Sequence, residues 1–446
     1  MQTNEIEVIN SDNDIYAKYK FLERQISDLQ NQFRIIDKYE YGKLVNYSQN
    51  HQEPYHGWFK YKEGYAADLV KNILNDFGYK KGDRVLDPFC GSGTTLLESK
   101  ILGLSSAGFD VNPVSAFIAK SKLCNYTKDD ILKINKFIEK FNIGNGYNED
   151  NIPKLSILDK IFKKEQLNDI LSLRELIDKY KGENIYFILK VAYLSIIESV
   201  SNMKKDGNGI KYLKNPNPQD VSTAFIDKVK VIVNDIENNI NTMDINQSHC
   251  VINDSFLNVL KYDKFENNSF NHIIFSPPYA NCFDYCAVYK MELWMGDFVE
   301  DYKDFKVLRK KAIRSHVNGS VDPNIVNEHP MINWISDELK KFDLWDKKIP
   351  TMLKGYFDDM AEVLKLCYQL LDKEGNCAIV VANSSYKGFV VPTDLILAEI
   401  ASQIGFEVRE IQICRPLRTS SQQANMSDEL KQYLRESNII LKKKEN

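Results

Sequence analysis

The sequence has no apolar segment long enough to cross a membrane. A span needs about 18 consecutive apolar residues, and the longest apolar stretch, residues 186–200, is interrupted by Lys190 and Glu198. The first 14 residues are polar and acidic, which argues against a secretory signal peptide. We therefore expect a cytoplasmic protein with no membrane partner.

Cysteine and histidine are too scattered to form a metal site or a disulfide framework. The chain of 446 residues has eight cysteines and six histidines, with no CxxC pair and no group at zinc-site spacing. In a cytoplasmic protein such cysteines are reduced thiols. We predict no bound metal and no histidine-dependent catalytic triad.

An excess of positive charge is also missing. Lys and Arg number 58 against 62 Asp and Glu, for a net charge of -4, so the chain as a whole does not attract nucleic acid. A polyanionic partner would need a local basic surface. The composition, 43% hydrophobic and 27% charged, is ordinary for a globular protein and excludes a mostly disordered chain.

Alternating strand and helix patterns begin near residue 83. Seven segments have the pattern of buried strands: 84–86, 106–110, 249–252, 271–275, 377–382, 407–414 and 438–441. Helical patterns follow the first two, which is typical of a doubly wound α/β fold with a mostly parallel sheet. Residues 127–245 have a helical pattern with no convincing strand. The sequence thus predicts a seven-stranded sheet, a helical insertion and a second, irregular insertion.

Residues 15–40 have a helical pattern with an apolar stripe. The stripe consists of Leu22, Ile26, Leu29, Phe33 and Ile36. Such a stripe either packs on the protein's own body or pairs with a second chain in a short coiled coil. We favour packing on the body.

A glycine loop lies at the first strand-to-helix turn, in the segment VLDPFCGSGTTLLES (85–99). Gly91 and Gly93 allow a ligand to approach the backbone closely, and the following helix offers free N–H groups. The third glycine of a dinucleotide fingerprint and the lysine of a P-loop are both absent. Asp110, at the end of the next strand, is placed to accept both hydroxyl groups of a ribose. This pattern favours a nucleoside-containing ligand.

A second motif, Ser-Pro-Pro-Tyr, follows the strand at 271–275. The prolines fix the backbone and remove N–H donors, so the neighbouring carbonyl groups are free to accept hydrogen bonds. Ser276 and the Pro277 carbonyl could bind both hydrogens of an amino group, and Tyr279 could stack on the ring that bears it. These acceptors would localise the lone pair of the amino nitrogen for attack. A base in a duplex must be flipped out to reach such a site.

The glycine loop followed by SPPY resembles the amino-methyltransferases of DNA, which use S-adenosylmethionine. The resemblance covers residues 54–125, 249–282 and 350–442, and it implies a Rossmann-like methyltransferase sheet. It also implies cofactor-binding roles for Tyr61, Lys62, Asp87, Pro88, Phe89, Gly91, Gly93, Thr94, Thr95, Asp110, Asn112 and Asp254. The implied catalytic residues are Ser276, Pro277, Pro278 and Tyr279.

The resemblance also implies a preference for the base: serine at the first motif position is the form typical of family members that methylate the cytosine 4-amino group, whereas members specific for the adenine 6-amino group more often have an acid or an amide there. Methylation of cytosine carbon 5 needs a cysteine nucleophile, usually in a Pro-Cys pair, and the sequence has no such pair. We expect a site-specific DNA methyltransferase of a restriction-modification or host-defence system. Adenine-N6 methylation of DNA, guanine-N2 methylation of tRNA and an inactive DNA-binding subunit remain open.

Three basic segments compete for contact with double-stranded DNA. Lysine and arginine suit phosphates, and arginine and glutamine also suit base edges. The candidate contacts are Lys204, Lys205, Lys211, Arg309, Lys310, Lys311, Arg314, Arg415, Arg418 and Gln422. A cognate restriction endonuclease is the expected protein partner, and the prokaryotic nucleoid the expected location.

These patterns divide the chain into six parts. They are an N-terminal helical extension (1–50), the cofactor half of the core (51–125), a helical insertion that could recognise the target (126–247), the catalytic half of the core (248–282), a basic and aromatic insertion that could contact DNA (283–350), and the last strands of the core (351–446).

Overall fold

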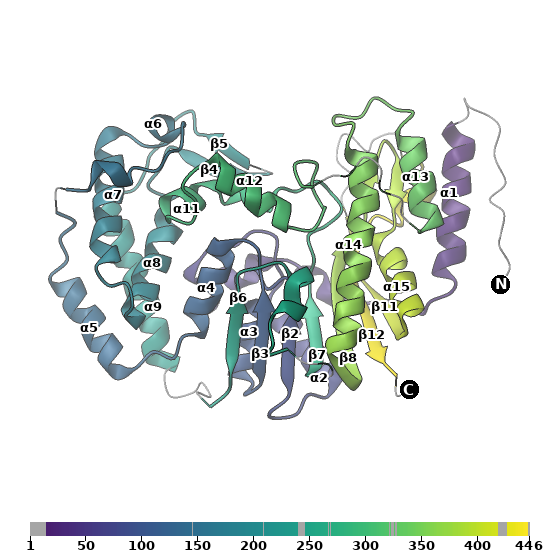
Figure 1. Ribbon diagram of the computed structural model, residues 1–446, viewed down its shortest axis with the longest axis horizontal. Coiled ribbons are helices and arrows are strands. Elements are labelled where there is room, and N and C mark those ends of the chain that lie inside the picture. Colours follow the sequence, from purple (N-terminus) through teal and green to yellow (C-terminus); the bar gives the residue numbers. More distant parts are fainter. Residues whose placement is uncertain are drawn as a thin grey trace.

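The computed structural model describes residues 15–144, 146–207, 209–239, 246–265, 267, 269–320, 322, 325, 328–417 and 426–444. Its centre is an eight-stranded sheet with the order β1-β11-β12-β8-β7-β2-β3-β6 (Figure 1). The strands are β1 (Ile35–Asp37), β2 (Arg84–Asp87), β3 (Ser105–Phe109), β6 (His249–Ile252), β7 (Phe270–Phe275), β8 (Leu371–Ala382), β11 (Phe406–Pro416) and β12 (Arg435–Lys443).

Most neighbouring strands of this sheet are parallel. β12 is the exception, since it runs antiparallel to both β8 and β11. The parallel order of β6, β3, β2, β7 and β8 changes direction between β2 and β7, as in a doubly wound sheet. The predicted α/β fold with a mostly parallel sheet is confirmed, and all seven predicted strands lie in it.

The eighth strand, β1, corrects the predicted N-terminal helix. Helix α1 (Ile15–Gln30) ends well before residue 40, and Ile35 and Ile36 join the edge of the sheet beside β11. β-Branched residues suit a strand better than a helix end. Leu22 and Ile26 of α1 are fully buried, and the helix contacts β10 (Phe389–Val391), α15 (Thr393–Ile404) and α16 (Asp428–Lys431). The apolar stripe therefore packs on the chain's own body.

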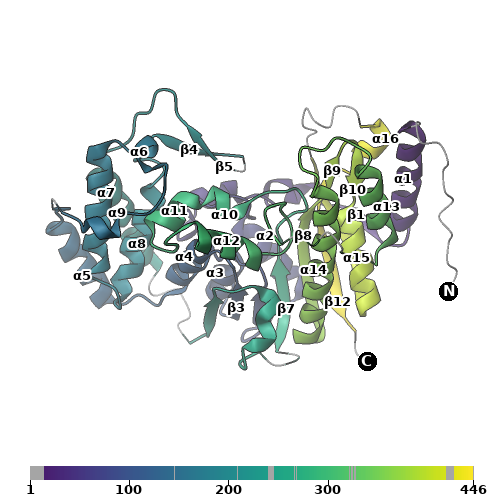
Figure 2. The ribbon, with the colours of Figure 1, turned by 45° about the horizontal axis from the view of Figure 1, so that its top comes forward.

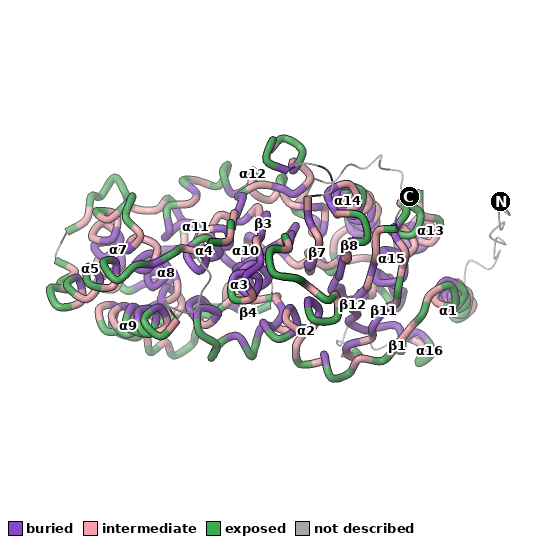
Figure 3. Tube along the Cα trace, turned by 90° about the horizontal axis from the view of Figure 1, so that it is seen from below, coloured by how far each residue is buried: buried purple, intermediate pink, exposed green. Residues whose placement is uncertain are grey.

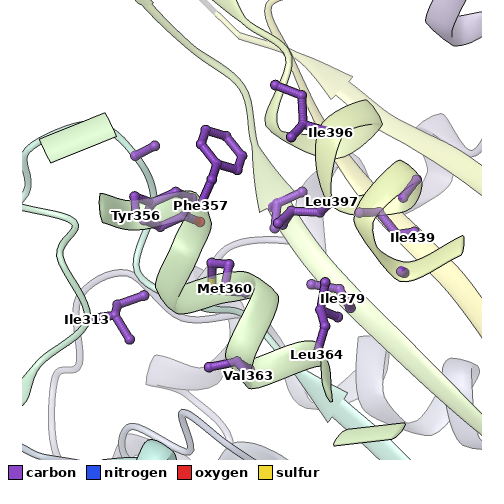
Figure 4. Close-up of a cluster of buried hydrophobic side chains, with 14 of the residues drawn as sticks. Ile313, Tyr356, Phe357, Met360, Val363, Leu364, Ile379, Ile396, Leu397 and Ile439 are labelled. Atoms are coloured by element: carbon purple, nitrogen blue, oxygen red, sulfur yellow. The ribbon is translucent and has the colours of Figure 1, made fainter. Parts of the chain in front are cut away.

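Helices cover both faces of the sheet. Ile273 points into a core shared with α14 (Ile349–Leu370) and α15, whereas its neighbour Ile274 points into a core shared with α2 (Ala67–Phe77). Figure 4 shows the first of these cores, where α14 side chains such as Met360 meet Ile379 of β8. Buried positions follow the strands and the inner sides of the helices (Figure 3).

The remaining elements of the sheet region are short or lie beside its edge. They are η1 (Tyr39–Lys43), η2 (Tyr47–His51), η3 (His56–Trp58), α3 (Thr94–Ile101), α4 (Pro113–Leu123), η5 (Phe256–Lys261) and β9 (Ser384–Tyr386), which pairs with β10. No helix of the described residues is long and apolar enough to cross a membrane.

The first insertion forms a helical body with its own apolar core. It contains α5 (Lys128–Glu139), η4 (Glu149–Asn151), α6 (Leu158–Ile161), α7 (Lys164–Asp178), α8 (Asn184–Ile196) and α9 (Val221–Asn239). In Figure 1 this body lies beside the β6 edge of the sheet, and α1 lies at the opposite edge.

A hairpin in the helical body corrects the expectation that residues 127–245 lack strands. Its strands are β4 (Met203–Asp206) and β5 (Gly209–Tyr212). The strands are short and mostly polar, so they lack the apolar alternation that predicts a strand. The dipeptide Asp206-Gly207 at the end of β4 is nevertheless a recognised hairpin signal.

The second insertion is more regular than predicted. It contains α10 (Tyr285–Val288), α11 (Lys290–Met295), α12 (Tyr302–Lys311) and α13 (Pro330–Leu339). Figure 2 shows α10, α11 and α12 between the helical body and the C-terminal part of the sheet. Trp294 and Phe305 join the core of the helical body, whereas α13 packs on α14. This insertion therefore connects the two bodies next to the loops that follow the strands.

Candidate functional site

A pocket lies where the carboxyl ends of β2, β3, β6 and β7 meet. Ligands of open α/β sheets bind at this edge, near the change in strand order. The pocket, called here the first pocket, is lined by loop residues after all four strands together with some of the residues within 61–65 and within 283–319. Eight predicted cofactor-binding residues line it: Tyr61, Pro88, Phe89, Gly91, Thr94, Asp110, Asn112 and Asp254. Ser276 and Pro278 of the SPPY motif line it as well.

The glycine loop leaves no room for a side chain at Gly91. This residue has a φ of 50°, and an added Cβ would lie 2.9 Å from the Tyr61 hydroxyl oxygen. Gly93 has a φ of 83°, and its Cβ would lie 2.9 Å from Cβ of Ala119. Gly91 thus lets Tyr61 lie over the loop, whereas Gly93 lets α3 approach α4.

Asp87 is buried beneath the loop and does not line the pocket. Its carboxylate accepts hydrogen bonds from the Tyr65 hydroxyl group and the Phe89 N–H group, each at 3.0 Å. Burial raises the pKa of Asp87 to about 6. Thr95 is also fully buried and contacts the Tyr65 hydroxyl group. These residues fix the shape of the loop from below.

Asp110 presents its carboxylate to the first pocket. One oxygen accepts a hydrogen bond from Gly91 N–H at 2.9 Å, and the other accepts one from Asn112 N–H at 2.7 Å. Burial raises the pKa of this carboxyl to about 7. Each carboxylate oxygen has further acceptor capacity, so the ionised group can also bind the two hydroxyl groups of a ribose.

Asp254, after β6, lies on another side of the first pocket. It accepts hydrogen bonds from the Tyr262 hydroxyl group at 3.0 Å and from Asn258 Nδ2 at 3.2 Å. Burial alone would raise the pKa of Asp254, but these hydrogen bonds and that of Ser255 N–H bring it below its ordinary value. This carboxylate stays charged and fixed in orientation.

The segment 61–65 contributes four residues to the wall of the first pocket and is attached to the second insertion; the four residues are Tyr61, Glu63, Gly64 and Tyr65. The rings of Tyr61 and Tyr289 stack with centroids 5.3 Å apart, and Lys62 N–H donates to the Tyr289 hydroxyl oxygen at 2.7 Å. Lys62 does not line the pocket, because its Nζ donates to the Lys205 carbonyl at 3.4 Å.

A second pocket adjoins the first at the SPPY motif. Four residues line both pockets: Glu63, Gly64, Ser276 and Tyr285. Tyr279, Asn281, Asn383, Arg415 and Glu436 are among those that line the second pocket alone. Ser276 therefore belongs to a wall with one pocket on each side. Pro277 is buried and lines neither.

The hydroxyl groups of the motif form a chain toward β12. Ser276 Oγ donates to the Tyr279 hydroxyl oxygen at 3.4 Å, and the Tyr279 hydroxyl group donates to Glu436 Oε1 at 2.7 Å. The sequence did not identify Glu436 or Tyr285 as site residues. A sequence signal for Glu436 was available, because the polar run Glu436-Ser437-Asn438 directly precedes the apolar run Ile439-Ile440-Leu441 in the same strand.

The structure corrects the DNA contact predicted for Lys205. Its side chain is buried, its ammonium group pairs with Glu292, and it lies over the rings of Phe59 and Tyr289. Lys205 alternates with exposed neighbours on β4, so its inward direction follows from the pleat of the hairpin. It joins the hairpin to α11 and cannot reach a phosphate from this position.

Two further predicted contacts, Arg309 and Arg314, are engaged within the protein. Arg309 pairs with Asp284 and lines the first pocket. Arg314 makes two hydrogen bonds to Asp359, at 2.7 and 3.0 Å. Both guanidinium groups thus have acidic partners that a DNA phosphate would have to replace.

The remaining basic candidates differ in exposure. Lys204, Lys310 and Lys311 are exposed, and Lys211 is exposed with Asp206 at 3.5 Å. Arg415 pairs with Glu436 in the second pocket. Arg418 and Gln422 lie outside the described residues.

The donor set of the first pocket fits a nucleoside cofactor with a positive charge. Gly91 lines the pocket with backbone alone, Asp110 offers acceptors for ribose, and the aromatic rings of Tyr61 and Phe89 offer apolar contact. Within the described ranges, no three His, Cys, Asp or Glu residues are grouped so that they could hold a metal ion.

Comparisons with known proteins agree with this chemistry. Residues 2–121 match a family model described as DNA methylase. The chain is 28% identical over 435 residues to the Type II methyltransferase M.BsoBI of Geobacillus stearothermophilus, covering 85% of this chain and 84% of that protein. It is 28% identical over 404 residues to the Type II methyltransferase M.AvaI of Anabaena variabilis, covering 83% and 82%.

A shorter match involves an RNA-modifying enzyme. The tRNA (guanine(10)-N2)-dimethyltransferase of Methanothermobacter thermautotrophicus is 36% identical over 67 residues, which cover 15% of this chain and 19% of that protein. Unlike the two longer matches, this match leaves most of the chain unaligned. The family model and the longer matches confirm the resemblance that the two motifs indicated: the chain is a methyltransferase similar to those that act on DNA, and its cofactor is S-adenosylmethionine.

Proposed function

We propose that the protein methylates the exocyclic 4-amino group of a cytosine flipped out of double-stranded DNA. The observation that carries this proposal is the position of Ser276, which lies on the wall shared by the two pockets. A methyl donor in the first pocket and a base in the second would meet there. The sheet edge and the glycine loop explain the first pocket, but they require no second one.

The chemistry of the shared wall suits an amino group. S-adenosylmethionine supplies a methyl group made electrophilic by the sulfonium charge. The Ser276 hydroxyl oxygen accepts a hydrogen bond from the amino group, which helps to localise the nitrogen lone pair; Pro277, expected to accept a second one, lines neither pocket. The new N–C bond forms as the C–S bond breaks, and the nitrogen then releases one proton to solvent. Tyr279 stacks on the ring during this step, and no covalent link to the enzyme forms.

Serine in the first motif position supports cytosine over adenine. The matching family model is named for both N6 and N4 methyltransferases, so adenine is the principal alternative. Methylation of guanine N2 in tRNA is a weaker alternative because that match covers a small part of the chain. An inactive DNA-binding subunit is disfavoured, since Gly91, Asp110 and Ser276 are all present and meet at the pockets.

The biological setting we infer is a restriction-modification system. Two relatives that match over most of their length are named Type II methyltransferases. In such a system the methyl group protects the cell's own DNA from a cognate endonuclease, which would recognise the same site. We place this activity in the prokaryotic cytoplasm, at the nucleoid.

The test is to identify the methylated nucleoside. The protein is incubated with unmethylated DNA and S-adenosylmethionine, the DNA is digested to nucleosides, and the products are separated by mass. Parallel reactions contain total tRNA or omit the protein. The proposal predicts 4-methylcytosine in DNA. A 6-methyladenine product overturns the assigned base, N2-methylguanine in tRNA overturns the assigned polymer, and no methylated product overturns the enzymatic proposal.

A further inference from the structure

The second pocket has a charged wall next to Tyr279 of the SPPY motif. Arg415 on β11 and Glu436 on β12 face each other as register partners, and Arg415 Nε donates to Glu436 Oε2 at 2.7 Å. The other carboxylate oxygen of Glu436 accepts from the Tyr279 hydroxyl group at 2.7 Å. One carboxylate thus fixes the positions of both a guanidinium group and the stacking tyrosine.

The terminal nitrogens of Arg415 remain available to a ligand. Within the described part of the chain they make no hydrogen bond, since only Nε is engaged. A register shift between Ile413 and Arg415 marks a β-bulge at this point of β11, and bulges change the direction of a side chain near functional sites. The side chain is 35% exposed and lines the second pocket, whereas Glu436 is only 3% exposed.

A guanidinium fork matches one base better than the others. Along its pairing edge, cytosine has an amino group followed by two acceptors, N3 and O2. Adenine has an amino group and a single acceptor, N1, followed by a carbon. Guanine and thymine each have a ring N–H donor where cytosine has N3. With the amino group held at Ser276, a fork beyond it could therefore bind both remaining positions only in cytosine.

We propose that Arg415 is the residue that selects cytosine, by donating hydrogen bonds to N3 and O2 of the flipped base. Glu436 is a positioning residue, because its carboxylate fixes the positions of the Arg415 guanidinium group and the Tyr279 hydroxyl group. This inference rests on the proposed function and deepens it. It also narrows the role of Arg415 from a candidate contact with double-stranded DNA to a contact with the flipped target base.

The test uses Arg415→Met with Arg409→Met as its control. Arg409 lies on the same strand, is 48% exposed at its side chain and pairs with Glu407 away from the pocket. Methylation is measured on a duplex carrying the site mapped from wild-type product, with either cytosine or 3-deazacytosine at the target position. The second base lacks N3. S-adenosylmethionine binding is measured in parallel as a check on folding.

The proposal predicts that Arg415→Met and the removal of N3 from the base have non-additive effects on the methylation rate. Arg415→Met should slow methylation of cytosine roughly tenfold to hundredfold, while cofactor binding and the Arg409→Met rate stay at the wild-type level. Replacement of N3 should slow the wild type strongly but slow Arg415→Met little further. Arg415→Lys, which keeps the charge but loses the fork, should remain impaired.

Two results would overturn the inference alone. One is 4-methylcytosine production by Arg415→Met within threefold of the Arg409→Met rate. The other is a 3-deazacytosine penalty of the same size in wild type and Arg415→Met, which would show that the fork does not contact N3. A 6-methyladenine product from the wild type would instead overturn the proposed base and this inference together.

Discussion

The ring and the hydroxyl group of Tyr279 have separate surroundings. The residue lines the second pocket, and its hydroxyl group donates to the buried Glu436. The ring is thus held in one orientation from behind, while it is available for stacking on a base. Stacking on an aromatic ring contributes about 1–3 kcal/mol per base.

Replacing Tyr279 should separate transfer from cofactor binding. Tyr279→Ala removes the stacking surface, so we expect the methyl-transfer rate to fall by a factor of roughly 5 to 150, with almost unchanged cofactor affinity. Tyr279→Phe keeps the ring and loses only the Glu436 contact, so its loss should be smaller. Single-turnover rates and calorimetric titrations measure the two quantities. An equal loss of both in Tyr279→Ala would mean that this ring also supports the first pocket.

Asp110 should make cofactor affinity depend on pH. Burial raises its pKa to about 7, and only the ionised carboxylate accepts both ribose hydroxyl groups. Below pH 7 the free protein holds a proton there that binding must displace, so affinity should rise with pH up to about 7 and then level off. Asp254, whose pKa lies below its ordinary value, stays ionised throughout this range.

Calorimetric titration measures the cofactor affinity at each pH. A range of roughly one and a half pH units on each side of the pKa of Asp110, which is about 7, tests this expectation. Asp110→Asn should bind roughly tenfold more weakly at high pH, since one charged acceptor is lost, and should show a much smaller pH dependence. A pH dependence that persists in this variant would assign the titration to another buried group such as Asp87, whose pKa is raised to about 6.

At the scale of elements, the glycine loop depends on a close contact rather than on backbone freedom alone. Gly91 and Gly78 both have positive φ, 50° and 66°, but nothing lies within 4 Å of a Cβ added to Gly78. Gly91→Ala should lower cofactor affinity at least roughly tenfold, since Tyr61 must move. Gly78→Ala, its matched control, should share only the backbone strain. Equal affinities for the two variants would contradict the role given to Tyr61.

The hairpin β4–β5 is attached to α11 by the buried pair of Lys205 and Glu292. Lys205→Met should lower the free energy of unfolding by about 3–5 kcal/mol, because it leaves Glu292 buried without its partner. The double variant Lys205→Met/Glu292→Leu should recover much of that loss. Urea unfolding monitored by circular dichroism measures both. A stable Lys205→Met that binds DNA more weakly would restore the predicted phosphate contact.

Local patterns were enough to predict most elements that carry the site. Short segments of sequence were enough to predict the strand before Asp87, the strand before Ser276 and the position of Asp110 at the end of a third strand. Their meeting at one edge follows from a parallel sheet. Strand β1 was missed because Ile35 and Ile36 become a strand only through pairing with β11, a partner far along the chain.

Burial of charged residues could not be predicted from the same patterns. Lys205 and Arg314 stand in basic segments and were expected to contact DNA, but each meets an acidic residue from a distant element. The pairing of Arg415 with Glu436 likewise requires the antiparallel register of β11 and β12. These contacts depend on tertiary arrangement, whereas motifs depend on neighbours in sequence.

At the scale of the whole molecule, the sheet and the two insertions meet around the two pockets. The segment that contains Tyr61 and Tyr65, together with the second insertion, supplies the walls that the strand loops leave open. The first insertion supplies a separate helical body beside the β6 edge (Figure 1). The reaction proposed here requires that this arrangement bring a methyl donor and an extruded base to opposite sides of Ser276.

A crystal structure with DNA and a nonreactive S-adenosylmethionine analogue tests that requirement most directly. We predict the analogue in the pocket lined by Gly91 and Asp110, and the target base in the pocket lined by Tyr279 and Arg415. The amino nitrogen should lie about 3–3.5 Å from the position of the transferred methyl group. A target base that remains stacked in the duplex, or an analogue bound away from Gly91, would contradict the proposed site.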